Sequence, residues 1–336
     1  MKTAALLLVV IASLTGYAAA ADEQDADPLA EPMQRARTLL AARKDADSLA
    51  AAAVLTFIAD RAGAEQLLAR AAAAPKRPDL RWLHAQMCKE VPDCDRKPID
   101  SQLRALDPDN GVTWLTALAD ARKDAAEIDR LLGQIAGSKK VDLYWNSLLG
   151  HLSAAVVSTN ALTPSQSVAT MTGIISAFAI PPFAGTVSPC RDAELFRPGR
   201  RARCQGVARA LQQGDTAIAE MVGNGMATRL WPDGSPEVRA ALESRRVFAW
   251  RTSISSEHSA RLLEEEAATR KYLERLTQYR RAECSLEIEV RHAKIRRDSS
   301  AARTSGEPSG QSRVAMPFPT ISTMAVSPCC RARATP

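Results

Sequence analysis

The chain has 336 residues and a formal charge of +6; 46% of its residues are hydrophobic and only 4% are aromatic. This length can bury one sizeable core or two modest ones. All of the net charge lies in residues 291–336, which hold eight Lys or Arg and two acidic residues, so the rest is close to neutral. A near-neutral folded part argues against a nucleic-acid-binding surface. Scarce β-branched runs favour helix over strand.

The first 21 residues have the three parts of a secretory signal peptide. Lys2 supplies the positive start, residues 4–14 the apolar stretch, and the alanines at 18–21 the small-residue cleavage site. The apolar stretch is shorter than the roughly 20 residues that a membrane-spanning helix needs. We therefore predict a signal peptide over residues 1–21 and a mature protein that is periplasmic or secreted, with no membrane span.

Residues 33–158 are predicted to form a region of helical pairs. In its first part, apolar residues recur three and four positions apart, which is typical of amphipathic helices. Turns are expected at 45–47 and 61–63, with Asp47 as the N-cap of the second helix. Asp79 is expected to cap the helix after these.

Tryptophan then returns at nearly constant spacing, at Trp82, Trp114 and Trp145, which are 32 and 31 residues apart. Helix, short turn and helix, repeated with a large aromatic residue near the first helix start, is the pattern of stacked antiparallel helical pairs. One pair cannot bury its apolar face alone, so neighbouring pairs are expected to stack. The last helix of this region is expected to start near Asp142.

These residues resemble the tetratricopeptide and Sel1-like repeat families. Trp114 matches the large residue near the start of a tetratricopeptide first helix, and residues 103–110 look like the repeat junction, with proline after the second helix. The repeat is shorter than the usual length of about 34 residues, and Gln86 and Leu118 stand where the family has a small residue. The resemblance covers about residues 47–152 and implies a solenoid-like fold with a protein-binding role.

The expected binding surface is a groove lined by the first helices of the pairs, and its partner is expected to be a protein or peptide. Its candidate residues are Trp82, Trp114, Trp145 and His151. The tryptophans can also be core residues that hold the pairs together, and His151 an ordinary core or surface histidine.

Residues 159–295 are predicted as a second, less regular helical region. One helix is expected to begin at Pro164 and to stop at Pro181-Pro182, and a short one to cover 202–213. A polar helix is expected from about 255 to 281. We interpret it as a solvated outer helix of a bundle, with a partner-binding helix as the alternative.

Between these, a helix is expected to start at 214–216 and to contain Gly223 and Gly225. Each glycine costs about 1 kcal/mol of helix stability. We interpret both as allowing close packing rather than forming a ligand site. Ser235 and Pro236 are expected to begin the next helix.

Export changes the interpretation of the seven cysteines. Cys88 and Cys94 flank a short turn, and Cys190 and Cys204 flank an Arg-rich loop. We predict two local disulfides, each stabilising the fold by about 2–3 kcal/mol, with free thiols as the alternative. Three cysteines have no predicted partner: Cys284, Cys329 and Cys330. Tight Cys/His spacing is lacking, so no metal or cofactor is predicted.

In residues 296–336 the periodicity disappears and Ser, Arg, Pro, Gly and Thr dominate. We predict a disordered basic tail. A translated frameshift is the alternative, and the basic charge would then carry no meaning.

The sequence lacks the motifs that would name an enzyme: a Gly-x-Ser-x-Gly elbow, Ser-x-x-Lys, His-Glu-x-x-His, or a phosphate-binding or dinucleotide glycine loop. We therefore predict an all-α exported protein-interaction module and assign no catalytic residue. One alternative is an exported hydrolase acting on envelope material, in which His151 would meet residues from 190–232. Another is an inhibitor of a secreted toxin.

Overall fold

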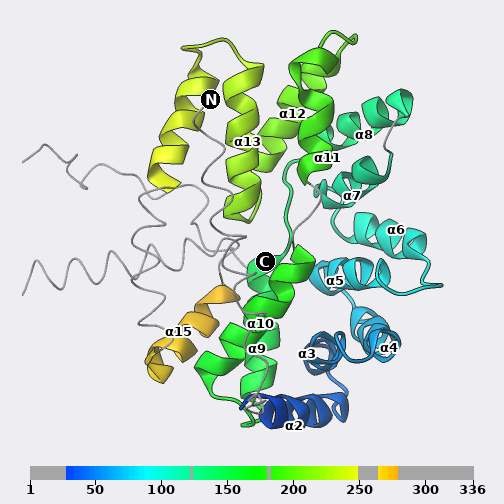
Figure 1. The fold of residues 1–336 in the computed structure, drawn as a ribbon, viewed down its shortest axis with the longest axis vertical. Coiled ribbons are helices and arrows are strands. Elements are labelled where there is room, and N and C mark those ends of the chain that lie inside the picture. Colours follow the sequence, from blue (N-terminus) through cyan, green and yellow to red (C-terminus); the bar gives the residue numbers. More distant parts are fainter. Residues whose placement is uncertain (1–27, 122–123, 180–182, 249–263, 279–336) are drawn as a thin grey trace, which may run out of the picture.

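The computed structural model describes residues 28–121, 124–179, 183–248 and 264–278 (Figure 1). Every regular element in these ranges is a helix, and the β-pairing among them is one isolated bridge, Asn110 to Lys140. The predicted all-α fold is confirmed. Several predicted features lie outside the described residues: the signal peptide, the Pro181-Pro182 stop, both ends of the 255–281 helix (255–263 and 279–281), the tail, and Cys284, Cys329 and Cys330.

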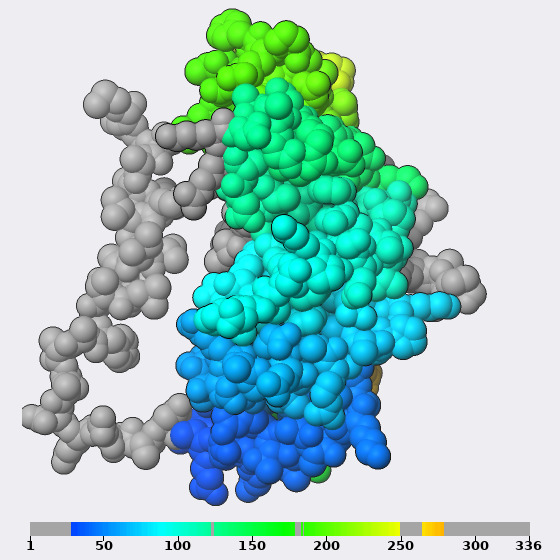
Figure 2. All heavy atoms as spheres, turned by 90° about the vertical axis from the view of Figure 1, so that its right-hand side faces the viewer, coloured from blue at the N-terminus to red at the C-terminus, as the bar shows by residue number. Residues whose placement is uncertain are grey.

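The first seven described helices form a row in which each helix packs against the next one in the chain. Figure 2 shows this row from one side, rising in sequence order from blue to green. The row consists of α2 (Ala30–Ala41), α3 (Ala46–Thr56), α4 (Arg61–Ala72), α5 (Pro78–Cys88), α6 (Arg96–Leu106), α7 (Val112–Asp120) and α8 (Ala125–Gly137). Within α3, the alanines at 50–53 are fully buried, and their small side chains let neighbouring helices approach closely.

The next three helices turn back and cover one side of the row (Figure 1). α9 (Trp145–Val157) packs against α3, α10 (Pro164–Ala179) packs against α9, α3 and α5, and α11 (Phe183–Val187) packs against α7. The tryptophan spacing predicted that α9 would continue the row. This prediction was wrong, because α9 packs back on α3. The helices that were expected to line a binding groove are instead contacted by later segments of the same chain.

The row resumes at α12 (Arg200–Gln212), which packs against α8 and pairs with α13 (Ala217–Leu230). Two short 3-10 turns, Ser188–Cys190 and Asp192–Glu194, connect α11 to α12. A helix over residues 236–248 follows α13. Finally, α15 (Glu266–Leu276) packs on α9 and α10.

Aspartate side chains cap many of the helix starts in the row. Asp45, Asp60, Asp95 and Asp124 accept backbone N–H groups from the first turns of α3, α4, α6 and α8. These bonds satisfy amides that have no partner within the helix. The prediction that Asp47 caps α3 was wrong, because Asp45 takes that role and Asp47 lies inside the first turn.

The start of α9 is stabilised by a residue that is distant in the sequence. Tyr144, the residue before the helix, has a φ of 57°, and α9 begins at Trp145 rather than near Asp142. The buried carboxylate of Asp215, in the α12–α13 loop, accepts the backbone N–H groups of Leu143 and Trp145 at 2.7 and 3.0 Å. The cap of α9 thus comes from a loop about 70 residues further along the chain.

One hydrophobic cluster extends from α2 to α15 and includes residues from both predicted helical regions. Their predicted boundary, at residues 158 and 159, falls between α9 and α10, which pack against each other. Among the helices that the structure describes, none combines the length and apolar character needed to cross a bilayer.

Candidate functional site

The three tryptophans predicted to line a groove lie in different environments. Trp82, on α5, is 2% exposed and belongs to the core. Trp114 is half-buried on α7, and the guanidinium carbons of Arg104 and Arg130 lie 4.6 and 5.8 Å from its ring centre. Trp145 is half-buried at the start of α9. Trp82 is therefore a core residue, whereas Trp114 and Trp145 keep accessible surface.

His151 lies on α9 in a polar cluster that α9 forms with α3 and the start of α5. Its Nδ1 lies 3.6 Å from Oδ2 of Asp47, and its side chain is 38% exposed. Arg77 donates hydrogen bonds to Asp47 and Asp79 at 2.7–2.9 Å. Ser147, one turn before His151, donates its hydroxyl proton to Asp79 at 2.8 Å. The cluster therefore links three helices by charge-assisted hydrogen bonds.

Asp79 is the second residue of α5 and not its cap, contrary to the prediction. Burial raises the pKa of Asp79, but the hydrogen bond and charge of Arg77, together with the Ser147 hydroxyl, outweigh burial and hold this pKa below its usual range. Because Ser147 directs its proton to Asp79, it lacks the contact with a histidine base that activates a serine nucleophile. We interpret the cluster as a structural link.

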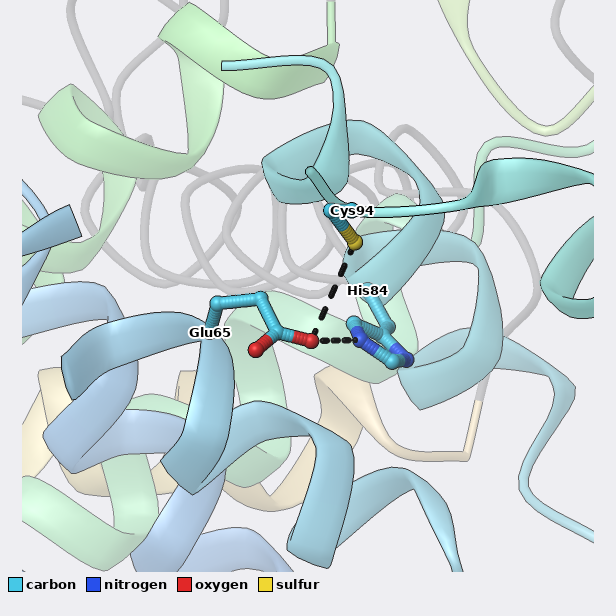
Figure 3. Close-up of side chains that lie close together, drawn as sticks. All are labelled: Glu65, His84 and Cys94. Atoms are coloured by element: carbon cyan, nitrogen blue, oxygen red, sulfur yellow. Dashed lines mark hydrogen bonds and ion pairs between the residues drawn. The ribbon is translucent and has the colours of Figure 1, made fainter. Parts of the chain in front are cut away.

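The predicted Cys88–Cys94 disulfide is confirmed, with Cα atoms 5.4 Å apart, and it closes the loop between α5 and α6. An open pocket lies between this loop and α4. Inside it, Glu65 of α4 reaches His84 of α5, with Oε1 and Nε2 2.8 Å apart. Sγ of Cys94 lies 3.9 Å from the same carboxylate oxygen (Figure 3). The three side chains come from three different elements and point toward one another.

The three side chains differ in how far they are buried, with Cys94 half-buried. The His84 side chain is 8% exposed and that of Glu65 22%, and Nδ1 of His84 has no hydrogen-bond partner among the described residues. Asp93 and Asp95 add two carboxylates to the lining of the pocket. The pocket thus presents an imidazole and carboxylates, which are groups that bind cations, beside a sulfur atom that is bonded in a disulfide.

The predicted Cys190–Cys204 disulfide is also confirmed, with Cα atoms 5.7 Å apart. The loop that it closes is braced by Arg200, whose side chain is only 1% exposed. Its Nε donates to Asp129 at 2.6 Å and its Nη1 donates to the carbonyl of Pro189 at 3.2 Å. The hydrogen bond from Arg200 lowers the pKa of Asp129, although burial acts in the opposite direction.

The tip of this loop presents Phe196, which is 90% exposed, beside Leu195, which is 8% exposed and belongs to the core. Gly199 has a φ of 71° and makes the turn into α12, a conformation that other residues seldom adopt. Arg203 donates to the carbonyl of Pro198 at 3.2 Å and closes the turn. Phe196 is therefore held in solvent by a loop that is anchored at both ends.

Neither the Glu65–His84–Cys94 group nor Phe196 was singled out from the sequence. The three groups of the pocket are 19 and 10 residues apart, which matches no local ligand motif, and they meet only because α4 packs on α5. The cysteine pairs were the signal that could have directed attention to both places, since each lies at a disulfide-closed loop.

The chain matches no family model, and no curated protein or solved structure is significantly similar to it.

Proposed function

We propose that this is an exported protein that acts by binding another protein, with Phe196 as the anchor of the contact. The observation that carries the proposal is the 90% exposure of Phe196 on a loop held by a disulfide and by buried Arg200. Large aromatic side chains dominate the energetics of protein interfaces. A loop that is already ordered loses little conformational entropy on binding, which favours affinity.

Export is supported by the signal-peptide pattern of residues 1–21 and by the two disulfides, which persist in oxidising compartments. The binding role is supported by the resemblance of residues 47–152 to tetratricopeptide and Sel1-like repeats. The row of paired helices is compatible with that resemblance.

The charge of the loop indicates the chemistry of the partner. Residues 190–204 contain five arginines and two acidic residues. Arg200 and Arg203 pair with Asp129, whereas Arg191 and Arg197 are exposed on either side of Phe196, with Arg197 beside Glu194. Arginine is enriched among residues that dominate binding energy, and complementary charge speeds and orients association. We therefore expect a protein partner with an apolar pocket rimmed by Asp and Glu. A secreted toxin that this chain inhibits would be one such partner.

Site-specific photo-cross-linking tests the proposal. A photoreactive residue placed at position 196 of the full mature protein should give a discrete adduct in envelope extract. Excess unlabelled wild type should abolish this adduct, and excess Phe196→Ala should not. Ile58 is 84% exposed at the end of α3 and serves as the matched control position, which should give no such adduct.

Phe196→Ala should change the free energy of unfolding by no more than about 0.5 kcal/mol, because the removed ring makes few contacts. Loss of binding in this variant would then reflect the contact and not the fold. If Phe196→Ala competes as well as wild type, or if position 58 gives the same adduct, Phe196 is not the anchor.

A further inference from the structure

The Glu65, His84 and Cys94 side chains form a group of three metal-ligating atoms that all lie within 4.8 Å of one another. Oxygen, nitrogen and sulfur ligands at about 2.0–2.3 Å are those that zinc takes in tetrahedral sites. These bond lengths place tetrahedral ligands about 3.3–3.6 Å apart. The observed distances of 2.8 Å from Glu65 to His84 and 3.9 Å from Glu65 to Cys94 lie on either side of that value. Small side-chain rotations would meet the geometry.

The disulfide decides whether this group can bind a metal. Cys94 is bonded to Cys88, and a sulfur in a disulfide carries no negative charge, whereas zinc binds thiolate. The two cysteines differ in position: Cys88 is 2% exposed and lies in a small apolar cluster with Ala85 and Ile99, whereas Cys94 is half-buried and lines the pocket. Reduction would therefore free one thiol beside Glu65 and His84 and leave the other inside the protein.

We propose that reduction of Cys88–Cys94 converts this pocket into a Zn²⁺ site with Glu65, His84 and Cys94 as its protein ligands. A dithiol reductant breaks the S–S bond, both protein sulfurs become thiols, and the reductant is oxidised to its own disulfide. When Zn²⁺ binds, the Cys94 thiol releases its proton to solvent. The open side of the pocket leaves the fourth position to water. This inference is independent of the contact proposed for Phe196.

The surrounding structure holds the ligands in place without the disulfide. Glu65 and His84 lie on α4 and α5, which pack against each other. The loop carrying Cys94 is held on one side by the hydrogen bond from its backbone N–H to the carbonyl of Val91, and on the other by Asp95, which caps α6. The site therefore requires only local adjustment once the S–S bond is broken.

Two cysteine variants of the full mature chain give a matched test. Cys88→Ser and Cys94→Ser break the same disulfide without any reductant, so Cys190–Cys204 stays intact in both. Only Cys88→Ser leaves a thiol in the pocket. The remaining cysteines, at 284, 329 and 330, are common to both variants and cancel in the comparison.

Competition with a chromophoric zinc chelator should show that Cys88→Ser binds one more Zn²⁺ than Cys94→Ser or the oxidised wild type. Adding His84→Gln or Glu65→Gln to Cys88→Ser should weaken this binding by about tenfold or more, because loss of even an outer-shell partner of a ligand costs about 10–100-fold. Co²⁺ should give a stronger thiolate charge-transfer absorption with Cys88→Ser than with Cys94→Ser. Equal Zn²⁺ binding by the two serine variants, or no effect of His84→Gln, would overturn the proposal.

A second measurement avoids any dependence on how the serine variants fold. In wild type treated with a dithiol, Zn²⁺ should slow alkylation of Cys94, as measured by peptide mass spectrometry, and in reduced His84→Gln it should not. Alkylation of Cys94 at the same rate with and without Zn²⁺ in the reduced wild type would contradict the site.

Discussion

Gly223 and Gly225 lie two residues apart in α13, and replacing each with alanine should have opposite effects on stability. Glycine in a helix costs about 0.5–1 kcal/mol relative to alanine, so helix propensity alone would give the same gain at both positions. The prediction that both glycines allow close packing holds for Gly223 and is wrong for Gly225. A Cβ on Gly223 would lie 2.8 Å from the carbonyl oxygen of Ala208 and 2.8 Å from the backbone nitrogen of Gln212, both on α12. Outside the backbone of α13 and the two adjacent residues, a Cβ on Gly225 would meet no atom of the described residues within 4 Å.

Gly225→Ala should therefore raise the free energy of unfolding by about 0.5–1 kcal/mol. At Gly223 the close atoms belong to the backbone and cannot rotate away, so α12 and α13 would have to move apart. Overpacking of this kind costs about 1–3 kcal/mol. After the gain in helix propensity, Gly223→Ala should lower the free energy of unfolding by about 0.5–2 kcal/mol.

Urea unfolding followed by circular dichroism measures both variants against wild type, and equal slopes with denaturant make the three free energies comparable. The expected gap between the two variants is about 1–3 kcal/mol, with opposite signs relative to wild type. If Gly223→Ala proves as stabilising as Gly225→Ala, then α12 and α13 do not approach as closely as the structure shows, and the reasoning fails.

Three further predictions concern buried groups. Asp215→Ala removes the distant cap of α9 and should lower the free energy of unfolding by about 2–4 kcal/mol, because each buried N–H left without an acceptor costs about 1–3 kcal/mol. Asp124→Ala removes the exposed local cap of α8 and should lower it by only about 1 kcal/mol. Equal losses for the two variants in urea unfolding would contradict the distant cap. Because folding lowers the pKa of Asp79, its ionised carboxylate stabilises the fold above the ordinary pKa of 3.8, and this stabilisation is lost as the pH falls through the folded pKa. The difference in free energy of unfolding between wild type and Asp79→Asn should therefore shrink between about pH 5 and pH 2. A difference that stays constant with pH would contradict the lowered pKa. Thermal unfolding should show a loss of about 3–5 kcal/mol for Trp82→Ala but only about 1–2 for Trp114→Ala, and a reversed order would contradict their burial.

The features that the sequence predicted correctly are local in the chain. Helices follow from the spacing of apolar residues three and four positions apart. The two disulfides join cysteines only 6 and 14 residues apart. Each cysteine therefore has its partner nearby in the chain, and the pairing can be predicted from spacing. Even a local signal loses precision when two similar residues compete: Asp45 and Asp47 both stand at the start of α3, and only the structure shows that Asp45 is the cap.

The position of α9 could not be predicted from local sequence patterns. The spacing of Trp145 after Trp114 predicted one more helix in the row, yet α9 packs on α3 at the other end. A helix with apolar residues can be buried against any complementary face, so its position depends on the packing of the whole core rather than on its own pattern. The cap from Asp215 is part of the same arrangement.

By itself, the sequence predicted that this chain is helical and that four of its cysteines close two loops, because both features depend on residues that lie close together in the chain. Only the tertiary structure brought Glu65 to His84 and Cys94. It also decided that Leu195 is buried while the adjacent Phe196 is exposed. Such contacts depend on how helices far apart in the sequence pack, and that packing is set by the summed burial of one shared core.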